Sequence, residues 1–370
     1  MPRYYVALTC VPGIGPMAAA SVLAAFPGPQ DAFEAGVALL RTSGLSEART
    51  RAMAGFNDWD AVDRILEDAE RAGQEIVTIA DPRYPGALRM MDGAPPVLFV
   101  RGSLEDTTQL AATIVGTRHP TPYGEKVAER LGAALARAGI CTVSGGARGI
   151  DGLAHRGALA AGGKTVVVCG AGLDVPYPPE HASLFEQVVA AGGTLLSELL
   201  PGTRPTRGTF PRRNRLLAGL GRAVVVVEAG DKSGALITAR YAMEQNKTVI
   251  AVPGQIDRAQ SKGTNRLIRD GAKPLLDIVD VVEEVLGEYQ RRGRAEDEAL
   301  QSFAPRVPPP PGDAGSVWDS LVLEPADTDE LVEKTGMDAA RVNAALVELE
   351  LMGRVKRRPG NRYYANLEDQ

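Results

Sequence analysis

The sequence has few of the residues that build several common kinds of functional site. It contains three cysteines and three histidines in 370 residues, and they do not stand at the spacing of a metal site. It has no run of eighteen apolar residues, and its N-terminus lacks a basic segment followed by a long apolar one. We therefore predict a reduced, cytoplasmic protein without a membrane span, a metal or a cofactor.

Familiar phosphate-binding and catalytic motifs are also missing. There is no G-x-x-x-x-G-K-[ST] P-loop, and the G-A-G at residues 170–172 lacks the third glycine of a dinucleotide fingerprint. Ser144 does not lie in a G-x-S-x-G elbow. Asp151 and His155 stand four apart and could form an acid/base pair. We favour a structural role, because an aspartate in the first turn of a helix also suits the helix dipole. The protein is predicted not to be an enzyme.

Six short β-branched runs alternate with amphipathic helical segments in the middle of the chain. They are residues 113–115, 141–143, 165–169, 194–196, 223–227 and 248–252. Nearly continuous apolar strands that alternate with helices are typical of a parallel sheet covered on both faces. The pattern predicts an α/β, doubly wound, Rossmann-like domain over residues 74–287.

The flanking segments differ in composition. Residues 1–73 have helical periodicity and predict a small helical domain of the SAM-like or helix-hairpin-helix type. Its turn at residues 12–15 is predicted to join two packed helices rather than to bind phosphate, because prolines there remove hydrogen-bond donors. Residues 288–315 are polar and proline-rich, which predicts a linker. Residues 316–370 show three helical segments and a hairpin, which predicts a winged helix.

The ends of two predicted strands combine glycine with arginine. In an open parallel sheet, ligands bind at the carboxyl ends of the strands. A glycine turn that leads into a helix leaves backbone N–H groups unpaired near the positive end of the helix dipole, and this favours an anion, most often a phosphate. The residues expected to contact it are Gly116, Thr117 and Arg118 after one strand, and Ser144, Gly145, Gly146, Arg148 and Gly149 after the next.

A third basic segment spans residues 204–215, with five arginines and no acid. Because the net charge of the chain is −5, any surface that binds a polyanion must be such a local concentration. The alternative is that these arginines pair with Glu198, Glu228 or other acids to brace loops. We favour a site for several phosphates of a single strand. The contacts expected there are Arg212, Arg213, Asn214 and Arg215.

The predicted winged helix has a basic hairpin. Its expected accessory DNA contacts are Lys356, Arg357, Arg358 and Arg362. Its recognition helix carries Glu348 and Glu350 beside Arg341, a poor combination for reading a major groove. We expect an accessory contact to DNA or protein without strong sequence specificity.

Seven collinear segments resemble the DprA/Smf family. They are residues 114–124, 143–155, 166–181, 195–202, 210–220, 225–242 and 252–272. The resemblance implies a homodimer that binds single-stranded DNA, interacts with RecA, and helps RecA displace single-strand-binding protein during natural transformation, with DNA repair as a further setting. It also implies phosphate contacts at Arg118, at the 144–146 turn and at Arg148, with residues 212–215 extending the path of the strand.

Two other functions stay open at this point. One is a nucleotide-hydrolysing enzyme of the lysine-decarboxylase-like phosphoribohydrolase type, which has similar glycine-rich strand ends. Its P-G-G-x-G-T motif with a following glutamate is missing from this sequence. The other is a winged-helix regulator that senses a nucleotide through the central domain.

Overall fold

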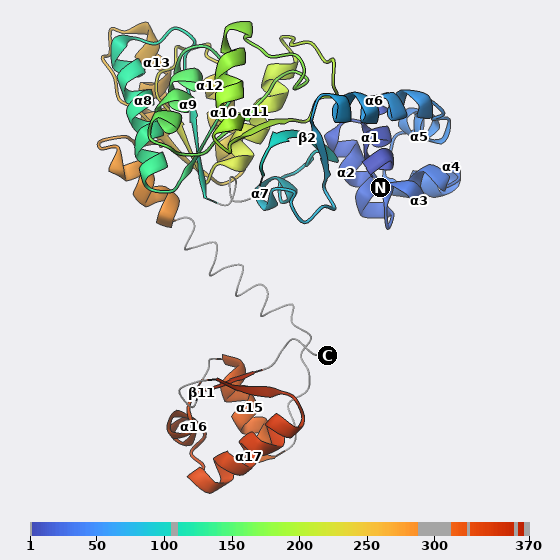
Figure 1. The fold of residues 1–370 in the computed structure, drawn as a ribbon, viewed down its shortest axis with the longest axis vertical. Coiled ribbons are helices and arrows are strands. Elements are labelled where there is room, and N and C mark those ends of the chain that lie inside the picture. The colour runs from blue at the N-terminus through green and yellow to red at the C-terminus, as the bar shows by residue number, and fades with distance from the viewer. Residues whose placement is uncertain (1, 105–109, 288–311, 324–325, 359–361, 366–370) are drawn as a thin grey trace. The chain divides into compact units, whose positions relative to one another are not determined.

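The computed structural model describes residues 2–104, 110–287, 312–323, 326–358 and 362–365 (Figure 1). The chain divides into two compact units, Met1–Arg291 and Arg292–Gln370, and each is described by itself. None of the helices in these ranges combines the length and the apolar composition of a membrane span.

A nine-stranded mixed sheet forms the centre of the first unit. Its strands are β1 (Glu75–Thr78), β2 (Val97–Gly102), β3 (Ala111–Val115), β4 (Cys141–Ser144), β5 (Thr165–Val168), β6 (Thr194–Ser197), β7 (Ala223–Val226), β8 (Thr248–Ala251) and β9 (Lys273–Pro274). They lie in the order β1-β2-β6-β5-β4-β3-β7-β8-β9. β2 runs antiparallel to both of its neighbours, and the pairs from β6 to β9 are parallel. The six predicted strands are confirmed, and the prediction missed β1, β2 and β9.

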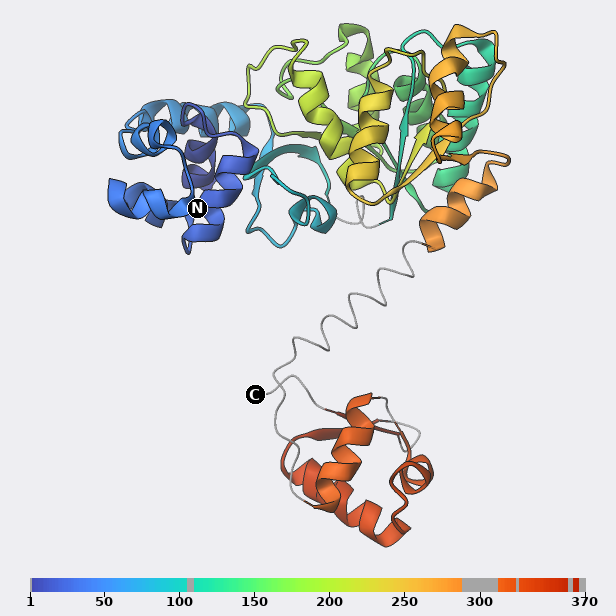
Figure 2. The ribbon, with the colours of Figure 1, turned by 180° about the vertical axis from the view of Figure 1, so that it is seen from behind.

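Helices cover both faces of this sheet, as the doubly wound prediction requires. One face carries α8 (Pro122–Arg137), α9 (Ile150–Ala160) and α10 (Ala182–Ala190), and the other carries α11 (Thr209–Leu220), α12 (Ala235–Glu244) and α13 (Lys262–Arg269). In Figure 2 the yellow-green α11 and the yellow α12 stand in front of the sheet. Alternate strand residues explain the two layers, since Ile114 packs toward α8 and α9 while Val115 packs toward α11 and α12. Short 3₁₀ turns lie at Pro179–His181 and Ala259–Ser261.

The order of the strands creates a switch point beside β3. β3 pairs with β4 on one side and with β7 on the other. The loop after β3 leads to α8 and the loop after β7 leads to α12, so the chain leaves these two neighbours toward opposite faces of the sheet. Ligands of open α/β sheets bind outside the carboxyl ends of strands at such a point.

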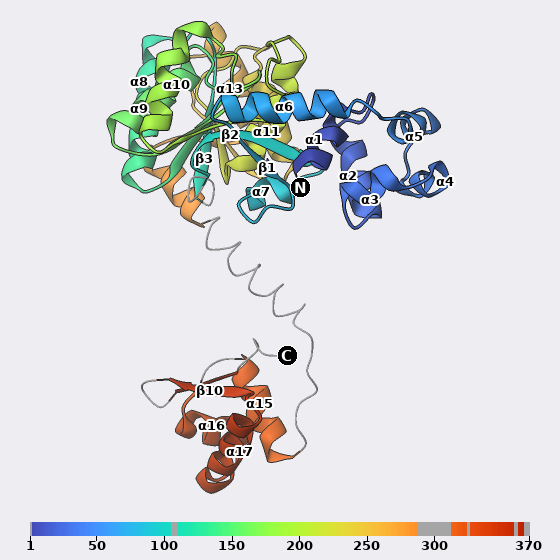
Figure 3. The same cartoon turned by 45° about the vertical axis from the view of Figure 1, so that its right-hand side comes forward.

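The N-terminal helices pack against the β2 side of the sheet. They are α1 (Pro2–Cys10), α2 (Pro16–Ala25), α3 (Pro29–Glu34), α4 (Val37–Leu40), a 3₁₀ turn (Arg41–Ser43), α5 (Glu47–Ala54) and α6 (Trp59–Arg71), and the short α7 (Gly86–Arg89) follows β1. Val6 and Val62 share a core with Val97 and Phe99 of β2, and Figure 3 shows α6 beside β1 and β2. A tight turn joins α1 to α2, as expected. Because this core is shared, the boundary between residues 73 and 74 stays a prediction.

The second unit is a winged helix, which confirms the prediction. It contains α15 (Asp313–Leu323), α16 (Thr328–Thr335), α17 (Ala339–Leu351) and the hairpin of β10 (Val355–Arg358) and β11 (Arg362–Ala365). Trp318, Leu331 and Leu346 are buried at its centre. α15 begins at Asp313, inside the predicted linker, and residues 288–311 of that linker lie outside the described residues.

Candidate functional site

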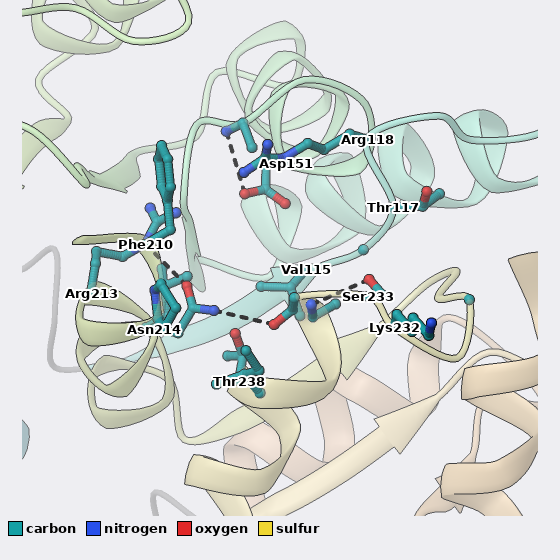
Figure 4. A pocket seen from close by; sticks show the side chains of 18 of the residues that line it. Val115, Thr117, Arg118, Asp151, Phe210, Arg213, Asn214, Lys232, Ser233 and Thr238 are labelled. Atoms are coloured by element: carbon teal, nitrogen blue, oxygen red, sulfur yellow. Dashed lines mark hydrogen bonds between the residues drawn. The ribbon is translucent and has the colours of Figure 1, made fainter. Parts of the chain in front are cut away.

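A cavity of about 520 Å³ opens at the carboxyl ends of β3 and β7. We call it the switch-point cavity. Four segments line it: the loop after β3, the turn after β4, the start of α11, and the loop from β7 into α12 (Figure 4). It therefore lies at the edge of the sheet where the strand order predicts a ligand.

Two exposed cations and one aromatic ring stand at this cavity. Arg118 is exposed, and its guanidinium carbon lies 5.2 Å from the centroid of the Phe210 ring. Lys232 lies in the loop after β7 and is exposed as well. Neither cation forms an ion pair with any residue that the structure describes. The half-buried Phe210 ring also lies 5.5 Å from that of Tyr177, between centroids. Both charges are thus available to an anionic ligand, next to a ring on which a base could stack.

The N-terminal ends of two helices add to the positive potential of the cavity. α11 and α12 both begin at its lining, and neither has an acidic residue in its first turn. Gly234, the N-cap of α12, supplies no side-chain cap, although the Ser233 hydroxyl accepts a hydrogen bond from the Ala235 N–H at 3.3 Å. The positive ends of helix dipoles favour anions, so the backbone and the two cations act in the same direction.

The turn after β4 corrects the sequence prediction. The Asp151 carboxylate accepts hydrogen bonds from the N–H groups of Gly145 at 3.1 Å and Ala147 at 3.4 Å. The expectation that these groups are unpaired is wrong, because a carboxylate from α9 takes the place of the anion. Ser144 has no exposed surface, and its hydroxyl donates to the carbonyl of Ile114 at 2.6 Å. Its side chain is therefore internal to the fold.

Glu228, after β7, and Ile150, at the start of α9, together fix the position of the loop after β3. The N–H of Thr117 donates to the carbonyl of Glu228 at 2.7 Å, and the carbonyl of Thr117 accepts from the N–H of Ile150 at 3.2 Å. A Cβ atom on Gly116 would lie 2.5 Å from Ile150, and one on Gly149 would lie 2.4 Å from the carbonyl oxygen of Thr117. These glycines thus serve close packing, and the packing presents Arg118 to the cavity.

Arg213 and Asn214 line the cavity but bind protein groups. Arg213 is only 5% exposed, and its guanidinium donates to the carbonyls of Gly145, at 2.8 Å, and Val168. Burial lowers its pKa, against the opposite effect of Asp151. The Asn214 amide donates to the carbonyl of Gly234 at 3.2 Å, which ties the loop before α12 to α11. Both side chains therefore position the lining, and their predicted role as direct contacts stays a prediction.

Three more of the predicted arginines pair with acids. Arg212 and Arg215 both form ion pairs with the buried carboxylate of Glu198, the former at 3.2 Å. Arg148 pairs with Glu180 on the surface, where Glu180 raises the pKa of Arg148 and Arg148 lowers that of Glu180. The bracing alternative thus describes these three side chains in the free protein. Arg212 and Arg148 remain about half exposed.

Sequence reasoning missed the loop from β7 into α12 as part of this site. Lys232, Ser233 and Gly234 line the cavity beside Arg118. A signal was present, since β7 is followed by a glycine and a lysine before the next helix. What was lacking was the knowledge that β7 pairs with β3, which brings the two loops together.

The paired Asp151 and His155 do not form an acid/base couple. His155 is fully buried, and its Nδ1 lies 2.7 Å from the Thr165 hydroxyl. Burial lowers the pKa of His155 to about 3. Both residues are therefore structural, as favoured from the sequence. Within the described ranges, no group of three His, Cys, Asp or Glu side chains is placed to hold a metal ion.

The winged helix presents few free cations in the part that is described. Arg362 donates to the Glu330 carboxylate at 3.0 and 3.1 Å, and Arg341 pairs with Asp313 at 2.6 Å. The side chains of Lys356, Arg357 and Arg358 lie outside the described residues. Their predicted role as accessory DNA contacts stays a prediction.

The fold and the site together define an α/β protein with a cavity at its switch point, lined by two exposed cations without ion pairs among the described residues, and with a winged-helix unit. The chain belongs to the family of DNA recombination-mediator protein A, whose model matches residues 75–286. A model of the DprA winged helix domain matches residues 301–361.

Relatives of known sequence and structure agree with this assignment. The chain is 35% identical over 389 residues to protein Smf of Synechocystis, with 97% of this chain and 98% of that protein covered. It is 39% identical over 322 residues to a putative DNA processing protein DprA of Mycobacterium tuberculosis, covering 81% and 80% of the two chains. The crystal structure of DprA from Streptococcus pneumoniae superposes with a TM-score of 0.66 at 33% identity, over 76% of this chain and 97% of that one. A structure of Helicobacter pylori DNA processing protein A, described for its single-stranded DNA binding mode, gives a TM-score of 0.52 at 31% identity, over 58% and 97%.

Proposed function

We propose that the protein binds single-stranded DNA at the switch-point cavity and acts as a recombination mediator. It would load RecA onto incoming single strands in natural transformation and help RecA displace single-strand-binding protein. The same activity would serve DNA repair. The observation that carries the proposal is the pair of unpaired cations, Arg118 and Lys232, beside the Phe210 ring at the starts of two helices. The DNA-binding relative from Helicobacter pylori supports it.

The proposed contacts divide into three groups. Arg118 and Lys232 bind phosphates directly, and Phe210 stacks on a base. Gly116, Thr117, Ser144, Gly145, Gly146, Gly149, Arg213 and Asn214 shape and hold the lining. Arg212, Arg215 and Arg148 extend the path of the strand when a phosphate replaces Glu198 or Glu180 as their partner.

A single strand fits this site better than a duplex or a small metabolite. An aromatic ring inside a cavity reaches a base only when the base is unpaired. The Asp151 carboxylate, which borders the cavity, is buried and bound to two backbone N–H groups. It is therefore poorly placed to act as the free acid or base that hydrolysis of a nucleotide needs. We also propose that the protein works as a homodimer.

The test uses RecA on single strands covered with single-strand-binding protein. The purified full chain should shorten the lag before RecA hydrolyses ATP on this DNA, and the Arg118→Ala variant should shorten it much less. Arg240→Ala is the matched control, because Arg240 lies exposed on α12 and pairs with Glu244. If wild type leaves the lag unchanged, the mediator function is refuted. Release of free base from AMP would favour the hydrolase instead.

A further inference from the structure

A second cavity, of about 670 Å³, lies at the carboxyl ends of β7 and β8. We call it the β7–β8 cavity. Its lining comes from the start of α8, from Glu228 after β7, and from the segment after β8. The lining residues are Thr121, Pro122, Tyr123, Glu228, Pro253, Gly254, Gln255, Arg258 and Ser261. None of these residues takes part in the switch-point cavity.

A buried carboxylate lies at this cavity. Glu228 is only 3% exposed, and its two oxygens accept hydrogen bonds from the N–H of Thr121 at 2.9 Å and from the Thr121 hydroxyl at 2.5 Å. No Lys, Arg or His in the described part of the chain forms an ion pair with it. A carboxylate has about four acceptor positions, so each oxygen keeps one for a ligand.

A second buried polar group faces the same space. The Ser261 side chain belongs to a residue only 5% exposed, and its hydroxyl has no hydrogen-bond partner among the residues described. The cavity therefore offers a ligand the free acceptor positions of the Glu228 carboxylate and the Ser261 hydroxyl.

The walls of the cavity are largely apolar. Tyr123 is 53% exposed, and its hydroxyl lies 3.4 Å from the carbonyl oxygen of Pro253. Pro122 and Pro253 add further apolar surface. Apolar walls with a few polar groups are typical of sites for small, partly aromatic ligands. A planar ring with a donor edge meets both requirements.

The β7–β8 cavity and the switch-point cavity flank the same short loop. Thr117 lines the switch-point cavity and donates its N–H to the Glu228 carbonyl at 2.7 Å. Thr121, four residues further along, donates to the carboxylate of the same glutamate. Residues 117–121 therefore supply lining residues to both cavities.

We propose that the β7–β8 cavity receives an unpaired base of the bound strand, with guanine preferred, and that Glu228 accepts hydrogen bonds from its N1–H and N2–H groups. Guanine presents two adjacent donors on this edge, which match two carboxylate oxygens. Adenine and cytosine present one amino group, and thymine presents a single N3–H between two carbonyl oxygens that a carboxylate repels. The inference rests on the proposed DNA-binding function and adds a base preference to it.

The experiment measures the affinity of the full chain for labelled oligonucleotides by fluorescence anisotropy. One probe is oligothymidylate of about 20 nucleotides, the second carries isolated guanines, and the third carries inosine at the same positions, which lacks the N2 amino group. We expect the guanine probe to bind about tenfold more tightly than oligothymidylate, with inosine between them. Glu228→Gln should remove this preference and leave the affinity for oligothymidylate within about twofold.

Control variants separate this inference from the proposed function. Glu129→Gln, at an exposed carboxylate on α8, should keep the guanine preference. Tyr123→Ala should weaken it, and serves as the second variant if Glu228→Gln unfolds at lower temperature. A wild type that does not distinguish the probes overturns the base pocket, as does a Glu228→Gln variant that still prefers guanine. If the cavity instead receives an arginine of a partner protein, the wild type will not distinguish the probes. If Arg118→Ala leaves binding of oligothymidylate unchanged, the proposed function itself fails.

Discussion

Replacing Arg118 by alanine removes one of the two unpaired cations at the switch-point cavity. The guanidinium makes no ion pair with the described residues, and its contact with Phe210 is a ring contact at 5.2 Å. The loop that carries it is held by backbone hydrogen bonds of Thr117 rather than by the arginine itself. Arg118→Ala should therefore leave the fold intact and change only binding.

The expected loss of affinity follows from the chemistry of the contact. A hydrogen bond to a charged group contributes about 1.5–3 kcal/mol, which corresponds to a loss of about 10- to 150-fold in affinity for single-stranded DNA. The salt dependence should change as well. Each phosphate neutralised on a single strand contributes about 0.7 to the slope of log K against log salt, so the variant should lose about that much of the slope.

The assay is anisotropy with oligothymidylate between about 50 and about 300 mM NaCl, a range in which electrostatic binding changes strongly. Arg240→Ala controls for the loss of a positive charge elsewhere on the same unit. The reasoning is refuted if Arg118→Ala keeps both the affinity and the salt slope of wild type. It is also refuted if Arg240→Ala loses as much affinity as Arg118→Ala, because the affinity would then depend on the total charge of the protein and not on the position of Arg118.

Three further predictions concern residues around the site. Glu180→Gln releases Arg148 from its ion pair, so the affinity for single-stranded DNA should rise about threefold. The affinity of this variant should also fall more steeply as the salt concentration increases, and an unchanged salt dependence would show that Arg148 does not contact the strand. Arg213→Ala leaves two buried carbonyls without their donor and Asp151 without its nearby cation. The free energy of unfolding in urea should therefore fall by about 3 kcal/mol, and a variant as stable as wild type would contradict the structural role of Arg213. Because burial lowers the pKa of His155 from 6.5 to about 3, the unfolded chain binds a proton below pH 6.5 that the folded protein does not. The free energy of unfolding should then fall by about 1.4 kcal/mol for each pH unit below 6.5, and His155→Gln should lack this part of the slope when the two proteins are unfolded at about pH 7 and about pH 5.5.

The central sheet could be predicted because its inner strands are buried on both faces. Such strands consist almost wholly of Val, Ile, Ala and Thr, as in residues 223–226, and they stand out between helices. The missed strands lie toward the edges of the sheet. β9 has two exposed residues, one of them a proline, and β1 has a single buried residue in four. β2 is apolar, but it pairs antiparallel and has no crossover helix beside it to mark it.

The site could be predicted only as far as single loops allow. Glycine and arginine at the end of β3 pointed to Arg118 correctly as a residue of a cavity. The pairing of Arg212 and Arg215 with Glu198 was raised from the sequence only as the less favoured alternative, because the acid lies on another strand end, 14 and 17 residues away. The burial of Arg213 depends on which face of α11 meets the sheet. The N–H groups of the 144–147 turn were assigned to a ligand. Their actual partner, Asp151, lies in the helix that follows the turn, and the sequence alone does not show that its carboxylate bonds back to the turn.

Ultraviolet cross-linking tests the central claim most directly. Oligothymidylate carrying bromodeoxyuridine is irradiated with the full chain, and the modified peptide is found by mass spectrometry. The proposed site predicts cross-links at Phe210, reduced by Arg118→Ala and unchanged by Arg240→Ala. Cross-links confined to the N-terminal helices or to the winged helix would show that the strand binds elsewhere and would contradict the account.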